Sequence, residues 1–164
     1  MLSWSFDGVG EQFEYIRHPA KWDQVQNNLQ KTIDKNIPNL FIDICYTVGI
    51  FNIYYMEEIL EWREKFKSDL PIYFNHVYTP EHFSCKVLPE IVKEKIVEKY
   101  KNNTHPDIIS SVKYCTDIDY DVEKMNMFYS QVKYSDEFRG ESFAKTFPEF
   151  YELLKQYADA PEDF

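Results

Sequence analysis

The sequence predicts an α/β fold in which parallel strands alternate with helices and a mostly helical segment follows. Three observations predict it. As far as residue 105, apolar runs of strand length alternate with stretches of helical periodicity. The order strand, helix, strand, helix, strand favours parallel pairing through right-handed crossovers. The 164 residues are 44% hydrophobic and 28% charged, which is typical of a globular chain with its own core.

The first part of the chain is expected to contain two strands and the helix between them. Residues 2–6 alternate apolar and small side chains, as a strand does, and residues 7–19 form a loop. Pro19 presets the start of a helix to residue 35, and its apolar positions keep helical spacing: Trp22, Val25, Leu29 and Ile33. Residues 40–48 are a nearly continuous apolar run, which favours a parallel strand covered on both faces.

A further helix and strand follow. Residues 53–66 form the clearest helix, with Asn52 as a suitable N-cap, and four apolar residues keep its period: Met56, Ile59, Leu60 and Phe66. Residues 72–77 form the third strand, and residues 78–88 form a long aromatic loop. Pro89 then opens a third helix, which extends to Tyr100.

The pattern changes beyond residue 105. Residues 108–138 show mixed and then amphipathic helical periodicity, and Phe147 and Pro148 start a final helix after a loop. We therefore expect two regions: residues 1–105, which carry the strands, and residues 106–164, a helical extension.

The charge balance narrows the possible partners. Lys and Arg number 18 and Asp and Glu number 28, which gives a formal net charge of −10. An acidic chain repels phosphate backbones, so nucleic acid is not expected as a partner. No apolar run approaches the roughly 20 residues of a membrane span, so no membrane partner is expected.

The cysteines indicate the compartment. The sequence has an odd number of cysteines, and they are widely spaced: Cys45, Cys85 and Cys115. Its first residues do not show the pattern of a signal peptide, in which basic residues precede an apolar run. We therefore expect free thiols and a reducing, cytoplasmic location.

Two apparent metal motifs do not meet the requirements of a metal site. His76, His82 and Cys85 have a spacing that matches no standard zinc pattern, and a fourth ligand is not evident. Three aspartates resemble the start of a calcium loop, but Val122 and Phe128 stand where the loop needs glycine and glutamate: Asp117, Asp119 and Asp121. We expect no metal ligand among these residues.

The end of the first strand is the strongest candidate for a small-molecule site. Ser5, Asp7 and Gly8 lie at its carboxyl end, and Arg17 lies in the loop that follows. In α/β sheets, ligands bind outside the carboxyl ends of the strands. We therefore expect this edge to carry the function.

Several segments occur in the order seen in one enzyme family. SFDG is followed by EQFEYI, Arg17 and HPAKW, and three more segments come later: CYTVGIFNIYYMEEILEW, IYFNHVYTPEHFSCKVLP and FRGESFAKTFPEF. In this the chain resembles the radical S-adenosylmethionine (SAM) superfamily, in particular its twitch-domain-containing proteins. The resemblance implies the C-terminal half of a partial (β/α)6 TIM-like barrel and, in residues 106–164, a reduced twitch-like region. Such enzymes use a [4Fe-4S] cluster to cleave SAM reductively to a 5′-deoxyadenosyl radical.

The resemblance also implies which residues bind SAM. They lie at or just after the expected strands: Ser5, Asp7, Arg17, Thr47, Asn52 and Val77. Ser5 and Arg17 fall where the family contacts the amino-acid end of SAM, and a guanidinium can hold a carboxylate through two parallel hydrogen bonds. Asp7 falls where it would fix the loop or the ribose. No catalytic residue is implied in this chain.

The chain departs from the family in one respect. The cluster loop, C-x3-C-x2-C, is absent, and three thiolates must come together on one loop to hold such a cluster. We therefore expect the cluster on a missing N-terminal half or on a partner chain, and we expect this chain alone to be inactive.

Other functions remain open at this point. The chain can instead be a non-catalytic α/β binding or interaction module that carries no cluster. An unpaired strand at the open edge of the sheet also favours self-association. The substrate is not indicated by any residue pattern.

Overall fold

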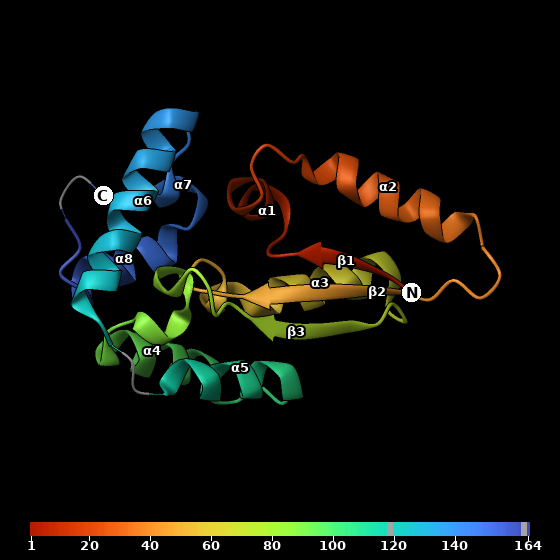
Figure 1. Ribbon diagram of the computed structural model, residues 1–164. Coiled ribbons are helices and arrows are strands. Elements are labelled where there is room, and N and C mark those ends of the chain that lie inside the picture. Colours follow the sequence, from red (N-terminus) through yellow and green to blue (C-terminus); the bar gives the residue numbers. More distant parts are fainter. Residues whose placement is uncertain (118–119, 162–163) are drawn as a thin grey trace. The chain divides into compact units, whose positions relative to one another are not determined.

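A computed structural model describes residues 1–117, 120–161 and 164 and has an α/β architecture (Figure 1). Three strands form one parallel sheet in the order β1-β2-β3: β1 (Leu2–Phe6), β2 (Ile42–Val48) and β3 (Ile72–His76). The predicted α/β class and the parallel strands are therefore confirmed. The chain divides into two compact units, which we name the sheet unit (Met1–Thr47 and Tyr55–Asn75) and the helical unit (Val48–Tyr54 and His76–Phe164).

The register of the sheet places polar side chains beside each other. In the parallel pair β1 and β2, Ser3 lies opposite Asp43 and Ser5 lies opposite Cys45. Because side chains alternate along a strand, these four side chains share one face of the sheet. The pairing starts next to β2, where the backbone N–H of Leu2 donates to the carbonyl of Phe41 at 2.8 Å.

Three helices belong to the sheet unit: α1 (Gly10–Ile16), α2 (Trp22–Asp34) and α3 (Met56–Lys67). The prediction that Pro19 starts the second of these helices is wrong. The Trp22 backbone N–H donates to the Glu14 carboxylate at 3.0 Å, so a side chain from α1 satisfies a free donor at the start of α2. A short 3-10 turn, η1 (Ile53–Tyr55), precedes α3.

An aromatic cluster holds the helices on one face of the sheet. Phe6 of β1 is fully buried, and its ring centroid lies 5.7 Å from that of Phe13 on α1, 5.2 Å from Trp22 on α2 and 5.4 Å from Trp62 on α3. The Trp62 indole N–H also donates to Gln26 of α2 at 2.6 Å. All three helices therefore pack on the face to which Phe6 points.

The other face of the sheet is polar, which corrects the expectation that the second strand is covered on both faces. On β2, Ile44 and Tyr46 are buried toward the helices, whereas Asp43, Cys45 and Thr47 point the opposite way. Cys45 and Thr47 are half-buried. Within the apolar run, side chains that point to the helices therefore alternate with side chains that point to the polar face, as is typical of a strand with one packed face.

The helical unit contains the remaining helices: α4 (Glu90–Tyr100), α5 (Pro106–Thr116), α6 (Val122–Arg139), α7 (Phe143–Thr146) and α8 (Pro148–Tyr157). Two 3-10 turns lie in the predicted aromatic loop: η2 (Glu81–Phe83) and η3 (Cys85–Val87). The core of the unit is built from fully buried phenylalanines: Phe128, Phe143, Phe147 and Phe150. The helical pattern predicted beyond residue 105 agrees with these helices.

Aspartate and serine side chains set the boundaries of two of these helices. Asp121 caps α6, because its carboxylate accepts the backbone N–H groups of Glu123 at 2.9 Å and Lys124 at 3.1 Å. Ser142 caps α7 in the same way, through the N–H of Lys145 at 3.3 Å. Asp121 thus has a structural role, while Asp119 of the calcium-like motif lies outside the described residues.

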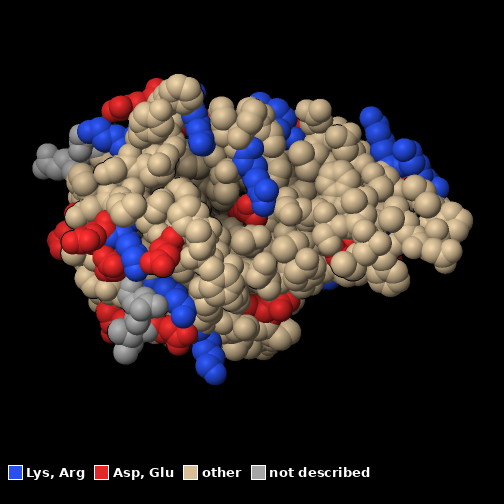
Figure 2. Space-filling view, viewed as in Figure 1, with Lys and Arg blue, Asp and Glu red and all other residues tan. Residues whose placement is uncertain are grey.

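The surface visible in Figure 2 carries acidic and basic side chains close to one another. Ion pairs occur among the described residues, such as Lys124 with Glu81 at 2.7 Å. Within the described part of the chain, no helix is both long enough and apolar enough to cross a membrane.

Candidate functional site

The end of β1 leads into α1 through a tight turn. Asp7 is buried, and Gly8 follows it. A Cβ atom at Gly8 would lie 3.0 Å from the backbone nitrogen of Phe13 and 3.1 Å from the Cβ atom of Gln12. The turn therefore favours glycine, because α1 approaches the backbone at the carboxyl end of the strand.

Asp7 holds the side chain of Arg17. The Arg17 Nε atom donates to Asp7 Oδ2 at 2.5 Å, and Arg17 is the C-cap of α1. The Arg17 side chain is 40% exposed, and its two Nη atoms make no hydrogen bond with any residue that the structure describes. The pair thus fixes the guanidinium by one edge and leaves its two-pronged end free to hold an anion.

Ser5 and Thr47 lie on the polar face of the sheet. Ser5 is exposed and stands opposite Cys45, while Thr47 is two residues farther along β2 on the same face. The Cys45 Sγ and Thr47 Oγ1 atoms are 4.0 Å apart. These groups form a polar strip that runs toward the carboxyl edge of the sheet.

Asn52 has a different structural role from the predicted N-cap. The N-cap of α3 is Tyr55, and Asn52 is buried, with its Oδ1 atom accepting the backbone N–H of Gly49 at 2.7 Å. The expectation that Asn52 caps the helix is wrong because η1 separates the two. The amide fixes the loop that follows β2.

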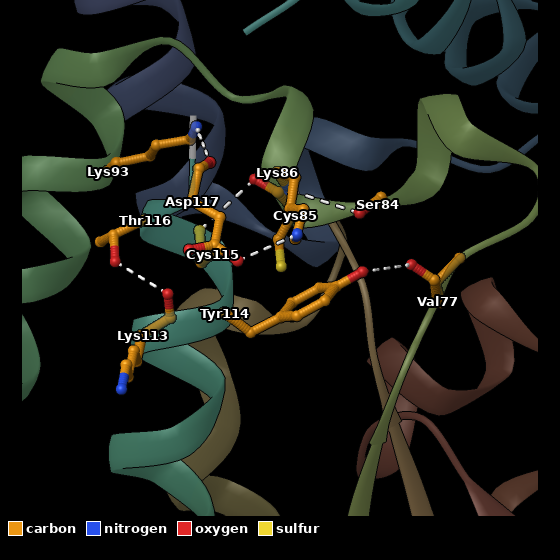
Figure 3. Close-up of polar contacts among 10 residues, drawn as sticks. All are labelled: Val77, Ser84, Cys85, Lys86, Lys93, Lys113, Tyr114, Cys115, Thr116 and Asp117. Carbon is orange, nitrogen blue, oxygen red and sulfur yellow. Dashed lines mark hydrogen bonds and ion pairs between the residues drawn. The ribbon is translucent and has the colours of Figure 1, made fainter. Parts of the chain in front are cut away.

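Val77 follows β3 and is held through its backbone. Its N–H donates to the Val48 carbonyl at 2.9 Å, and its own carbonyl accepts the Tyr114 hydroxyl at 3.4 Å (Figure 3). Its side chain also packs on the loop after β2, because a Cβ atom at Gly49 would lie 2.9 Å from Val77 Cγ2. Asn52 and Val77 thus belong to the helical unit, whereas Ser5, Asp7, Arg17 and Thr47 belong to the sheet unit.

A polar cluster around Tyr114 was not predicted from the sequence. The His76 ring stacks on the Tyr114 ring with centroids 4.2 Å apart, and His76 Nε2 lies 3.1 Å from Ser111 Oγ. The Lys86 ammonium lies 4.5 Å from the centre of the Tyr114 ring and pairs with Asp117 at 3.1 Å (Figure 3). Burial and then the charge of Lys86 lower the pKa of His76, so the imidazole is held in its neutral form.

The Tyr114 cluster has no signal in the sequence. Its members come from the end of β3, from η3 and from α5, and only folding brings them together. In the sequence, His76 forms an apparent motif only with His82 and Cys85. The partners of His76 are instead Ser111 and Tyr114, which are ordinary helix residues by sequence.

The three thiols do not fit an iron–sulfur cluster. Cys85 and Cys115 are fully buried, and the Cys115 thiol donates to the Cys85 carbonyl at 3.4 Å. A hydrogen bond with the Cys85 thiol, followed by burial, raises the pKa of Cys115 well above its ordinary value, whereas a cluster ligand must be a thiolate. Cys45 lies in the sheet unit, and the described residues contain no group of three side chains able to hold a metal ion.

The residues of the sheet unit do fit one end of SAM. SAM carries a carboxylate and an amine at that end; the Arg17 guanidinium offers donors for the carboxylate, and Ser5 is an exposed hydroxyl in the same unit. Comparison with known proteins neither supports nor opposes the assignment of SAM to these residues. No protein-family model matches the chain, and neither the curated proteins nor the solved structures compared with it contain a match.

Proposed function

We propose that the sheet unit is part of a β/α barrel of the radical SAM type and that its carboxyl edge binds SAM. The observation that carries this proposal is the one-sided sheet. Phe6, Ile44 and Tyr46 point to the helices, while the opposite face is lined by polar groups. In a β/α barrel the helices form the outer ring and the other face of each strand points inward.

The connectivity supports a barrel over a doubly wound sheet. Consecutive strands are neighbours in the order β1-β2-β3, so successive right-handed crossovers place their helices on the same face. A doubly wound sheet reverses its strand order and carries helices on both faces. The polar face of β2 would be a poor surface for a second layer of helices.

Arg17 and Ser5 take the amino-acid end of SAM in this proposal. Asp7 orients the guanidinium through Nε, and the two Nη atoms remain for the two oxygens of the carboxylate. The Ser5 hydroxyl accepts from the amine or donates to the carboxylate, and Thr47 adds a hydroxyl on the next strand. Asn52 and Val77 belong to the helical unit and are not assigned to this site.

The iron–sulfur cluster is assigned to other polypeptide. In radical SAM enzymes the cluster supplies the electron for reductive cleavage, and the cysteines of this chain do not fit that role. This chain therefore contributes SAM binding, and residues 106–164 are proposed to be a reduced twitch-like extension. The chain by itself is expected to be inactive.

Equilibrium dialysis of the purified chain against SAM tests the proposal. The expected result is binding by the wild type and about tenfold or greater weakening by Arg17→Gln, because a charge-assisted hydrogen-bond pair is lost. Arg139→Gln is the control, since it removes the same charge at the end of α6 in the helical unit. Equal affinity of the two variants would overturn the assignment of Arg17.

A non-catalytic interaction module is the second candidate function. The misfit of the three cysteines to a cluster favours it. The two candidate functions predict different coding sequences upstream of the DNA that encodes this chain. A C-x3-C-x2-C loop encoded there in frame supports the enzyme, and its absence from both that frame and any co-purifying chain supports the module.

A further inference from the structure

The polar face of the sheet extends over all three strands. Alternation along the strands and the contacts of Tyr73 place seven side chains on it, and none of them is aliphatic: Ser3, Ser5, Asp43, Cys45, Thr47, Tyr73 and Asn75. A helix that packs on a sheet needs an apolar surface beneath it. The composition of this face is instead that of a wall that faces water or a polar molecule.

Among the described residues of the three strands, Asp43 is the one carboxylate on this face, and it lies in an unusual environment. The residue is only 9% exposed, and its Oδ1 atom is buried without a hydrogen bond to any described residue. It also forms no ion pair within the described part of the chain. A buried carboxylate without a donor is unfavourable, so a partner that brings donors and positive charge would be bound strongly.

One hydroxyl on each neighbouring strand lies near Asp43. Ser3 of β1 stands directly opposite it. On β3, the pKa of Tyr73 is raised, chiefly by a hydrogen bond with the Cys45 thiol. A hydrogen bond with Ser3 lowers this pKa, and the negative charge of Asp43 raises it further. Tyr73, Ser3 and Asp43 are therefore close neighbours, one from each strand.

The chemistry of this group selects among possible occupants. A calcium or magnesium ion takes six or more oxygen ligands, and the described residues contain no group of three or more His, Cys, Asp or Glu side chains that could hold a metal ion. An anion would be repelled by Asp43. An ammonium group, with three donors and one positive charge, matches a carboxylate flanked by two hydroxyl acceptors.

We propose that the polar sheet face binds a small, polar amine, whose ammonium group pairs with Asp43 and bonds to the hydroxyls of Ser3 and Tyr73. The inference rests on the proposed function, because it makes this face the inner wall of the barrel and the amine its substrate class. The site differs from the SAM contacts, since Asp43 lies four residues before Thr47 on β2, away from the carboxyl edge.

The test is an NMR titration of the labelled chain with propylammonium chloride at constant ionic strength. Propan-1-ol, which is similar in size and uncharged, is the matched probe. The expected result is saturable shifts of the Asp43 and Tyr73 signals with the amine and none with the alcohol. Equal shifts with both probes, or no saturable shift with the amine, would overturn the proposal.

Asp43→Asn and Asp23→Asn separate a binding role from a structural one. Both remove one negative charge, but Asp23 is exposed on α2, on the helical side of the sheet. We expect Asp43→Asn to weaken amine binding about tenfold or more while its unfolding midpoint in urea is unchanged or raised, because an unpaired buried charge is removed. A lowered midpoint, with amine binding retained, would show that Asp43 is structural.

The amine site and the SAM site can fail separately. Arg17→Gln is expected to leave the propylammonium shifts unchanged, and Asp43→Asn is expected to leave SAM dialysis unchanged. If the wild-type chain binds the amine but not SAM, the proposed function is rejected and the amine site is not. The reverse pattern would reject only the amine site.

Discussion

Arg17 and Asp7 form an ion pair across the turn between β1 and α1, with Arg17 Nε 2.5 Å from Asp7 Oδ2. The pair joins the carboxyl end of the first strand to the C-terminus of the first helix. It also determines which atoms of the guanidinium remain available. An arginine held by one edge loses little side-chain freedom when it binds an anion through the other.

Asp7→Asn is expected to lower the free energy of unfolding by about 1 kcal/mol. A charge-assisted hydrogen bond is lost, but the Arg17 side chain is 40% exposed, so solvent screening reduces the effect. Urea unfolding followed by circular dichroism measures it. Glu11→Gln, at an exposed position of α1, is the control and should change stability by no more than about 0.5 kcal/mol. Equal stability of the two variants would show that the pair contributes nothing.

Phe6→Ala is expected to destabilise the chain by about 3–5 kcal/mol, because it removes a fully buried ring that contacts aromatic rings on three helices. Thermal and urea unfolding measure the loss. Phe41→Ala is the control, since Phe41 is 70% exposed and its change should stay within about 0.5 kcal/mol. A small effect at Phe6 would contradict the packing of the helices on this face.

His76 is expected to make stability depend on pH. Its pKa in the folded chain lies below the ordinary value of 6.5, so between the two values only the unfolded chain binds the proton. The contribution of His76 is therefore complete above pH 6.5 and is lost as the pH falls through the lowered pKa. Urea midpoints measured from neutral to mildly acidic pH should fall along this series.

The His76→Phe variant isolates this effect. Phenylalanine keeps a flat ring against Tyr114 but cannot titrate, so the variant should show a shallower fall of the midpoint with pH. An unchanged slope in His76→Phe would assign the pH dependence to other groups.

Tyr129→Phe is expected to lower stability by about 1 kcal/mol. The buried Tyr129 hydroxyl donates to the Ala158 carbonyl at 3.0 Å, and burial raises its pKa, so the proton stays in place. Tyr134→Phe removes a hydroxyl from the same helix at a residue that is 62% exposed and should have little effect. Equal unfolding midpoints of the two variants would contradict the importance of this hydrogen bond.

The strands and most helices could be predicted because local patterns determine them. Residues 2–6 were predicted to the residue, and the third strand differs only at its last position. The start of α2 could not be predicted, because the Glu14 carboxylate that caps it comes from another helix. The polar face of β2 could not be predicted, since Cys45 and Thr47 count as strand formers whether or not they are covered.

The site was predictable only where it follows strand ends. Ser5, Asp7, Arg17 and Thr47 belong to one unit, as the rule for parallel sheets implies. The ion pair of Arg17 and the buried carboxylate of Asp43 depend on three-dimensional contacts. No spacing in the sequence distinguishes Asp43 from the apolar residues on either side of it.

The most direct test of the account is the ratio of affinities for SAM and for 5′-methylthioadenosine, which lacks the amino-acid end of SAM. Dialysis should give tighter binding of SAM by the wild type, and Arg17→Gln should remove that preference while leaving the affinity for 5′-methylthioadenosine unchanged. A wild-type chain that binds neither compound, or an Arg17→Gln variant that keeps the preference for SAM, would contradict the account.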